Sequence, residues 1–167
     1  MKRRILLFLF TTIIATAAMS GCAERSVTPV GASPGLAAAE SRLSTEDERI
    51  RQAESLIEKM PGSAIGYVNL ATAYIQAARE TGDFSLNSKA ENAVSRALEI
   101  EPENASAQKL RASLHLTFHR FAEALEAGEK LQKNYPKDAF VYGVLTDANV
   151  ELGNYAAAVE TAQKMVD

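Results

Sequence analysis

The residues of this 167-residue chain whose spacing could hold a metal ion are His115 and His119. On a helix, positions four apart lie on one face, as they do in helical zinc sites. In metalloproteases a glutamate follows the first histidine and acts as the base, but Leu116 follows His115 here. The sequence has no other histidine, and its single cysteine stands far away at position 22. We therefore expect both histidines to be structural and the protein to bind no metal.

Other catalytic chemistry has little support in the sequence. The glycine-rich patterns that cradle phosphate groups, G-x-x-x-x-G-K and G-x-G-x-x-G, do not occur. Acidic residues gather at 46–48 and 99–103, close to expected helix ends, where they are most simply helix-end and solvated charges. Acid–base catalysis by paired carboxylates needs a pocket, and no pattern indicates one. We expect a protein that is not an enzyme, uses no cofactor and has no small-molecule substrate.

The first 21 residues have the form of an export signal. Residues 2–4 are basic, and residues 5–19 carry no charge. This apolar run is shorter than the roughly 20 residues of a membrane-spanning helix, so we expect a signal peptide that is cleaved on export. The only cysteine, Cys22, follows directly.

The four residues Met19-Ser20-Gly21-Cys22 resemble the lipobox of bacterial lipoproteins. The resemblance implies that Cys22 is lipidated and becomes the first residue of the mature chain. Two or three acyl chains, at about 0.8 kcal/mol per buried methylene, would hold the protein stably on a membrane. Met19 stands where the family more often has Leu, and an ordinary secretory signal beside an unrelated cysteine is the alternative. Ala23, rather than Asp, follows the cysteine, which by the enterobacterial sorting rule implies the periplasmic face of the outer membrane in a Gram-negative cell.

Residues 22–43 are expected to be a flexible tether. Alanine, serine, glycine and proline dominate this stretch, and Pro29, Gly31, Pro34 and Gly35 interrupt any helical period. Such a segment buries too little apolar surface to offset the entropy of ordering it. The remaining residues, 44–167, suffice for one domain of ordinary size.

The composition favours helices and excludes one class of partner. Hydrophobic residues make up 47% of the chain, but only 7% are aromatic and none is Trp, and much of the apolar content is alanine, which suits close helix packing. The net charge is −3, and cleavage of the signal would remove three basic residues and no acidic one. A protein that binds the phosphate backbone needs a clustered basic face, so we expect no nucleic acid partner.

Three prolines organise the domain. Pro61, Pro102 and Pro136 each close a helical pattern and precede another, and the last two are 34 residues apart. We expect helices near residues 46–60, 63–80, 87–100, 104–117, 121–133, 138–151 and 154–167.

Further positions agree when the segments are aligned on these prolines. A tyrosine lies six residues after Pro61 and after Pro136, at Tyr67 and Tyr142, and a Leu-Ala or Leu-Thr pair lies nine and ten residues after the same prolines, at Leu70-Ala71 and Leu145-Thr146. Alanines stand at the expected helix crossings, Ala124 and Ala158, and a Gly-Asn-Tyr turn occupies Gly153–Tyr155. Over residues 44–167 the pattern resembles tetratricopeptide repeats, whose period is 34 residues. The resemblance implies an all-α, right-handed superhelical solenoid of antiparallel helix pairs, with about three repeats.

Two departures from the family pattern lead to further expectations. The interval from Pro61 to Pro102 is 41 residues, and the seven extra residues, two helical turns, can lengthen one hairpin around 79–88 without changing its buried faces. Arg111 occupies a position where the family has Leu, and Leu110 could compensate by a rotation of the helix.

In this family the first helix of each pair lines a concave groove. By offset from the prolines, we expect the partner-binding lining to be Ile65, Val68, Thr72, Ile75, Lys109, Ser113, Leu116, Phe140, Asp147 and Val150. The apolar members of this set are either part of the core or a surface for an amphipathic helix or an extended peptide. Chaperone adaptors of the family bind the C-terminal carboxylate of a peptide with Lys, Asn and Arg side chains. The matching positions here are Val68, Thr72, Leu110, Phe140 and Val144, which cannot bind a carboxylate in this way. The sequence therefore disfavours a receptor for chaperone tails.

The expected function is therefore that of a lipid-anchored adaptor or scaffold in the bacterial cell envelope, with a protein or peptide client. One alternative is the N-terminal regulatory array of a longer envelope enzyme or secretion component, and another is a structural self-assembler. No polar capping helix follows the last expected helix, so we expect that the array continues beyond residue 167 or that a partner covers its end.

Overall fold

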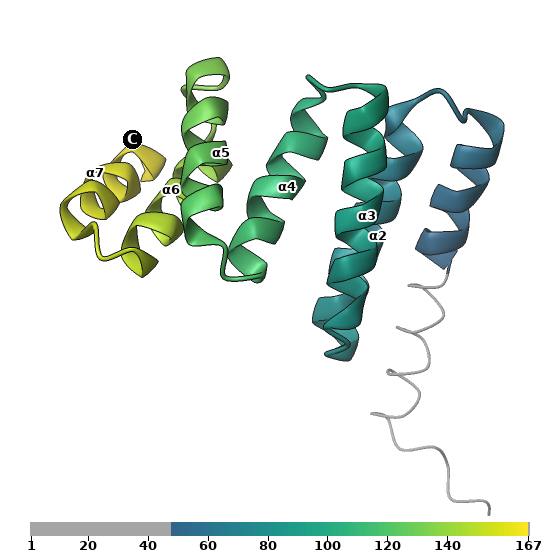
Figure 1. The fold of residues 1–167 in the computed structure, drawn as a ribbon, viewed down its shortest axis with the longest axis horizontal. Helices are drawn as coiled ribbons and strands as arrows, with labels where there is room; N and C mark the ends of the chain where they lie inside the picture. The colour runs from purple at the N-terminus through teal and green to yellow at the C-terminus, as the bar shows by residue number, and fades with distance from the viewer. Residues whose placement is uncertain (1–47, 167) are drawn as a thin grey trace, which may run out of the picture.

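The computed structural model describes residues 48–166, and every regular element among them is a helix. The expected signal peptide, Cys22 and the tether lie outside these residues. A helix over residues 48–59 is followed by α2 (Ala64–Thr81), α3 (Ser85–Ile100), α4 (Ala105–Thr117), α5 (Phe121–Asn134), α6 (Ala139–Glu151) and α7 (Tyr155–Val166). Figure 1 shows these helices side by side along one axis, with neighbours running in opposite directions.

Local sequence signals set most of the boundaries. The three prolines each follow the end of a helix by two residues. Polar side chains then cap the next helix: Ser63 Oγ, Asn104 Oδ1 and Asp138 Oδ1 accept hydrogen bonds from the backbone N–H groups of Ile65, Ala107 and Phe140 at 3.4, 3.0 and 3.0 Å. These boundaries agree with the expected ones to within one or two residues.

The long first hairpin is confirmed. The helix α2 has 18 residues and α3 has 16, whereas α4 to α7 have 12 to 14. Gly82 ends α2 in the left-handed region, with φ of 75°, and its N–H donates to the carbonyl of Ala78. Asp83 then accepts a hydrogen bond from the N–H of Ser85 at 3.0 Å. The helix α3 begins at Ser85, two residues earlier than expected.

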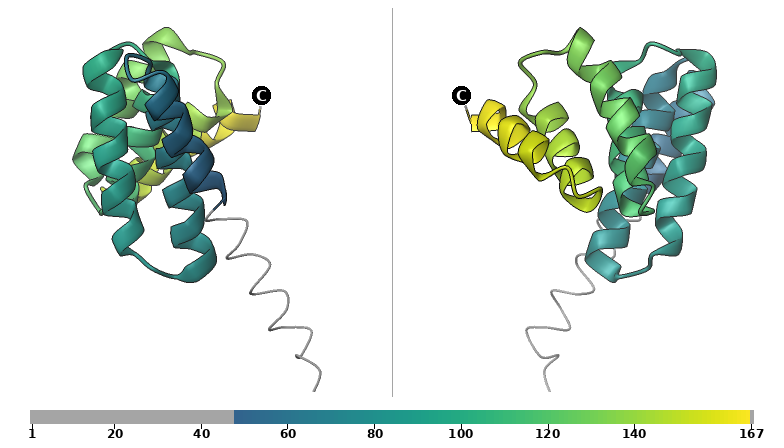
Figure 2. Two further views of the ribbon diagram at one scale, coloured as in Figure 1. Left: turned by 90° about the vertical axis from the view of Figure 1, so that its right-hand side faces the viewer. Right: turned by 60° about the vertical axis from the view of Figure 1, so that its left-hand side comes forward.

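The helices pack in a way that curves the array. Each helix from α2 to α7 contacts the next, and the first helices of the pairs also contact one another, α2 with α4 and α4 with α6. Within the described part of the chain, the second helices α3, α5 and α7 make no such contacts among themselves. Because the first helices touch one another and the second helices spread apart, α2, α4 and α6 lie on the inner side of the curve. Figure 2 shows the array from two further sides.

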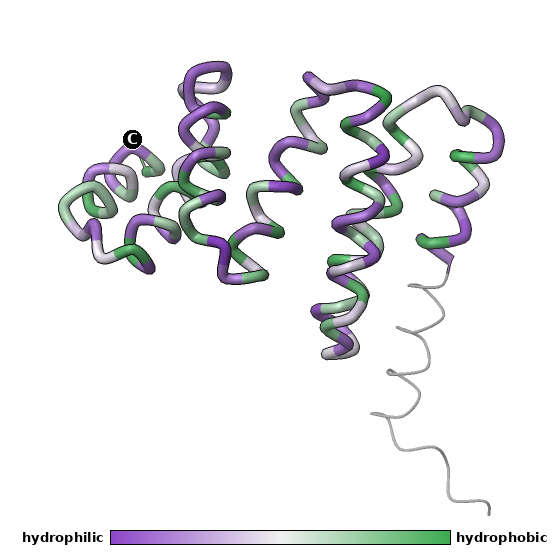
Figure 3. The backbone as a smooth tube through the Cα atoms, viewed as in Figure 1, coloured by the Kyte–Doolittle hydropathy of each residue, from purple (hydrophilic) through white to green (hydrophobic). Residues whose placement is uncertain are grey.

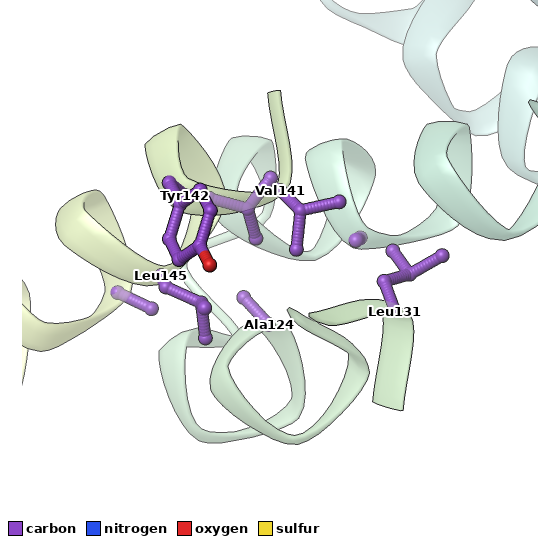
Figure 4. Close-up of a cluster of buried hydrophobic side chains, with 8 residues drawn as sticks. Ala124, Leu131, Val141, Tyr142 and Leu145 are labelled. Carbon is purple, nitrogen blue, oxygen red and sulfur yellow. The ribbon is translucent and has the colours of Figure 1, made fainter. Parts of the chain in front are cut away.

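Small residues allow the helices to approach closely. The largest buried cluster joins α4, α5 and α6 and includes Ala124, Leu131, Val141, Tyr142 and Leu145 (Figure 4). Ala124 is fully buried, as expected for an alanine at a helix crossing. On the same face of α5, a Cβ added to Gly128 would lie 2.8 Å from Leu145 Cδ2. A larger side chain at either position would push α5 away from α6.

The substitution of Arg111 for the family's Leu is accommodated as expected. Arg111 is exposed, and Leu110 packs against the buried cluster that contains Ala90, Val94 and Leu114. Figure 3 shows apolar and polar residues interspersed along the helices. In α3, for example, the buried residues Ala90, Ala93, Val94 and Ala97 recur at helical spacing. None of the helices within residues 48–166 is long and apolar enough to cross a bilayer.

Candidate partner-binding groove

The concave face is lined by α2, α4 and α6, and most of the predicted groove residues lie on it with accessible side chains. Ile65, Phe140 and Val150 are 50%, 44% and 45% exposed, which is high for large apolar residues. Asp147 is also exposed. The other accessible members are half-buried: Val68, Thr72, Lys109, Ser113 and Leu116.

Ile75 is a correction to the predicted groove, because its side chain is only 9% exposed. It belongs to a buried cluster with Ala71, Ala90 and Val94. Residues 71, 75 and 78 lie on one stripe of α2, and the long α3 covers that stripe along its extra turns. Val68 is intermediate, since one side of it packs against Ala64, Ala97 and Ala107.

Six of the accessible groove residues line three hollows. Thr72 faces a hollow of about 390 Å³ that α2 shares with the helix over residues 48–59. Ile65 and Val68 line a second hollow of about 370 Å³ together with Ser106 at the start of α4. Leu116, Asp147 and Val150 line a third, of about 250 Å³, between the C-terminal ends of α4 and α6.

Lys109 is held by the protein itself. Its Nζ forms an ion pair with Asp138, the residue that caps α6, and lies 5.3 Å from the centre of the Tyr135 ring. The hydrogen bond from Lys109 holds the pKa of the Asp138 carboxyl below its usual range, and the backbone N–H of Phe140 adds to this effect. Lys109 therefore links two repeats and does not offer a free cation to a ligand.

The segment after α4 adds two side chains to the third hollow that the predicted groove lacked, namely His119 and Phe121. Both follow the end of α4, where His119 adopts the left-handed conformation with φ of 58°. The His119 and Phe121 rings pack edge to face, with centroids 5.5 Å apart. The family offset identifies residues on the first helices only, so it does not find side chains that the turn contributes.

The two histidines do not form a helical metal site. His119 lies beyond the end of α4, and His115 Nδ1 is buried with no hydrogen-bond partner in the described part of the chain. Burial, together with the charges of Arg120 and Arg111, lowers the pKa of His115. Within residues 48–166 no group of three or more His, Cys, Asp or Glu side chains could hold a metal ion.

One sequence pattern with a possible catalytic meaning lies outside the described residues. Residues 31–35 read Gly-Ala-Ser-Pro-Gly and match G-x-S-x-G by their letters. The nucleophilic serine of that motif needs a strand before it and a helix after it. The alanine- and proline-rich sequence around Ser33 does not predict a strand, so the pattern carries no catalytic assignment.

Comparison with known proteins supports the fold. No family model matches the chain, and no curated protein matches its sequence. A solved structure titled "MamA RS-1 ArsTM double mutant" is similar with a TM-score of 0.62 at 19% identity, over 78% of this chain and 71% of that one. MamA is a tetratricopeptide repeat protein. The chain is thus an all-α helical repeat solenoid of the tetratricopeptide type.

Proposed function

We propose that this protein is an adaptor or scaffold of the bacterial cell envelope, anchored to a membrane through lipidated Cys22. In this proposal the concave face of α2, α4 and α6 binds a segment of a protein client, and the protein catalyses no reaction. The tether of residues 22–43 lets the repeat domain reach clients away from the bilayer surface.

The observation that carries the proposal is the exposure of large apolar side chains along the concave face. Ile65, Phe140 and Val150 are 44–50% exposed although they stand on helices whose other sides are well packed. Apolar anchors in a concave surface are a common means of holding a peptide or an amphipathic helix. The tetratricopeptide-type fold supports a role in protein binding.

Site-specific photo-crosslinking in cells tests the client-binding role. A photoreactive amino acid would replace Ile65 or Phe140 on the concave face, and Ser95 or Glu129, which are exposed on the second helices α3 and α5, would serve as matched controls. We expect discrete adducts from the first two positions and few from the controls. Equal labelling from both sets would contradict a groove-directed adaptor.

The anchor is tested separately with the variant Cys22→Ala and metabolic labelling by an alkyne analogue of palmitate. We expect the label and the membrane association to be lost, whereas the circular dichroism melt of the helical domain stays the same. Label that persists on the variant would refute lipidation at Cys22.

A second candidate is that the domain regulates a longer envelope enzyme or secretion component. The observation that favours it is the apolar outer side of α7, where Tyr155, Val159 and Val166 are 68%, 71% and 72% exposed. A further packed element would cover these side chains. The open reading frame beyond Asp167 distinguishes the two candidates, because only the second requires an enzyme or a secretion domain there.

A further inference from the structure

The hollow between the C-terminal ends of α4 and α6 combines apolar walls with negative charge. Its walls include Leu116 from α4, Phe121 from the start of α5 and Val150 from α6, and its rim carries Asp147 and Glu151. Its volume of about 250 Å³ is below the roughly 300–1,000 Å³ of typical small-molecule sites. It therefore suits one large side chain of a bound segment better than a cofactor.

The two carboxylates of this hollow have no partner among the described residues. Asp147 and Glu151 stand one turn apart on α6 and are exposed, and neither forms an ion pair or a hydrogen bond within residues 48–166. Another acid on the concave face differs: Glu101 accepts hydrogen bonds from the Asn104 side chain and the Ala64 N–H, at 2.9 and 3.2 Å. The third hollow thus carries two acidic side chains that have no protein partner within residues 48–166.

Asp147 and Glu151 stand near the C-terminal end of α6, where the helix itself contributes negative charge. The carbonyl end of a helix carries partial negative charge, and basic side chains are favoured there. The last turns of α2, α5 and α7 contain Arg79, Lys133 and Lys164, whereas the last turns of α3 and α6 contain no basic residue. The nearby cation Arg120 is already paired with Glu91. A cation supplied from outside would therefore be stabilised at this end of α6.

We propose that this hollow binds a lysine or arginine side chain of the client segment. The methylene groups would pack against Leu116, Phe121 and Val150, and the charged group would lie between Asp147 and Glu151. Long cationic side chains commonly place their stems on apolar surface and their charged ends near water or an acid. The bound client segment is thus basic and amphipathic. This inference rests on the proposed client binding by the groove and specifies the chemistry of the client.

The chain offers a closely matched control for the test. Glu54 and Glu58 are also exposed, are also four residues apart on a helix and also lack ion pairs in the described part of the protein. The double variant Asp147→Asn/Glu151→Gln and the control Glu54→Gln/Glu58→Gln therefore remove the same charge with the same change in shape. Neither should lower the melting temperature, because all four side chains are solvent-exposed.

The probe is a library of random twelve-residue peptides displayed on phage, selected on the full-length protein in mild detergent. We expect enriched peptides to contain Lys or Arg beside apolar residues. The best peptide should bind the Asp147→Asn/Glu151→Gln variant roughly 2- to 10-fold more weakly by fluorescence anisotropy, which is the effect expected for one or two exposed charge pairs. The control variant should bind like the wild type, and replacing the peptide's basic residue with norleucine should have the same effect as removing the acids.

The outcomes separate this inference from the proposed function. Enriched peptides without a basic preference, or a preference that survives in Asp147→Asn/Glu151→Gln, would overturn the cationic pocket and leave the groove as a binding surface. A loss shared equally by the control variant would also overturn it, because the effect would then reflect net charge alone. If no peptide is enriched at all, both the pocket and the groove lose their support.

Discussion

Lys109 on α4 forms an ion pair with Asp138, the residue that caps the N-terminus of α6, 29 positions later in the chain. Asp138 thus has two roles, since its Oδ1 accepts from the Phe140 N–H while its Oδ2 binds Lys109. The first is a local helix signal, and the second connects consecutive repeats on the concave face.

Substitutions at Asp138 separate these two roles. Asp138→Asn keeps an N-cap acceptor and loses the ion pair, so we expect a cost of at most about 1 kcal/mol. Asp138→Ala loses the cap as well and should cost roughly 0.5–2 kcal/mol more. Urea unfolding monitored by circular dichroism measures both. Equal effects of the two variants would mean that the cap contributes nothing.

The same pair predicts a pH dependence of stability. The folded protein holds the pKa of Asp138 below that of an unfolded Asp, which is about 3.9. The stabilisation that the Asp138 carboxylate contributes is fully present above the unfolded pKa and is lost as the pH falls through the lower pKa of the folded protein. Comparing the melting temperatures of wild type and Asp138→Asn between pH 6 and pH 2.5 tests this sign, because their difference should shrink on acidification.

His115 predicts a pH dependence in a higher range. Burial lowers its pKa below the value of about 6.5 in an unfolded chain. As the pH falls from 7 to 5, the unfolded chain takes up a proton at this position more readily than the folded protein, so stability decreases. We expect His115→Gln to lose less stability over this range than the wild type. Parallel pH profiles of the two proteins would contradict the prediction.

The crossing of α5 with its neighbours can be tested at two alanines of one helix. Ala124 is fully buried and Ala122 is exposed. We expect Ala124→Leu to overpack the crossing and cost roughly 1–3 kcal/mol, while Ala122→Leu leaves the unfolding free energy nearly unchanged. Similar melts for the two variants would show that the assigned crossing is wrong.

Gly66 tests how closely the helix over residues 48–59 approaches α2. A Cβ at Gly66 would lie 2.7 Å from Ile57 Cγ1 and 3.0 Å from the Ile57 backbone nitrogen, whereas a Cβ at Gly62 would meet no atom within 4 Å. We expect Gly66→Ala to destabilise the domain by about 1–3 kcal/mol, although alanine is the better helix former by about 1 kcal/mol. Gly62→Ala is the control and should be tolerated. A stabilised Gly66→Ala would mean that the two helices are further apart.

Ile75 and Phe140 were both predicted to line the groove, and the structure separates them. Ile75→Ala should cost about 2–5 kcal/mol, because it leaves a cavity beside Ala71 and Val94. Phe140→Ala should lower client crosslinking and change the melting temperature by no more than a degree or two, because Phe140 is 44% exposed. A large destabilisation by Phe140→Ala would assign this side chain to the core.

The sequence by itself determined the features of the fold that depend on interactions between residues close together in the chain. A proline ends a helix because it lacks an N–H donor, and Ser63, Asn104 and Asp138 start the next one because their side chains replace missing backbone partners. The 34-residue spacing then predicted the helix pairs, and the alanine pattern predicted the crossing at Ala124. These signals act within a few residues, so they can be recognised without knowing what packs against them.

Only the tertiary structure decided which side chains remain accessible on the concave face. Ile75 is buried because the long α3 covers its stripe of α2, and Lys109 is engaged because α4 lies beside the cap of α6. His119 and Phe121 join Leu116, Asp147 and Val150 around one hollow because the turn after α4 and the start of α5 place them there. Family offsets assign a residue to a helix face, but the length and angle of the neighbouring helix decide whether that face is covered.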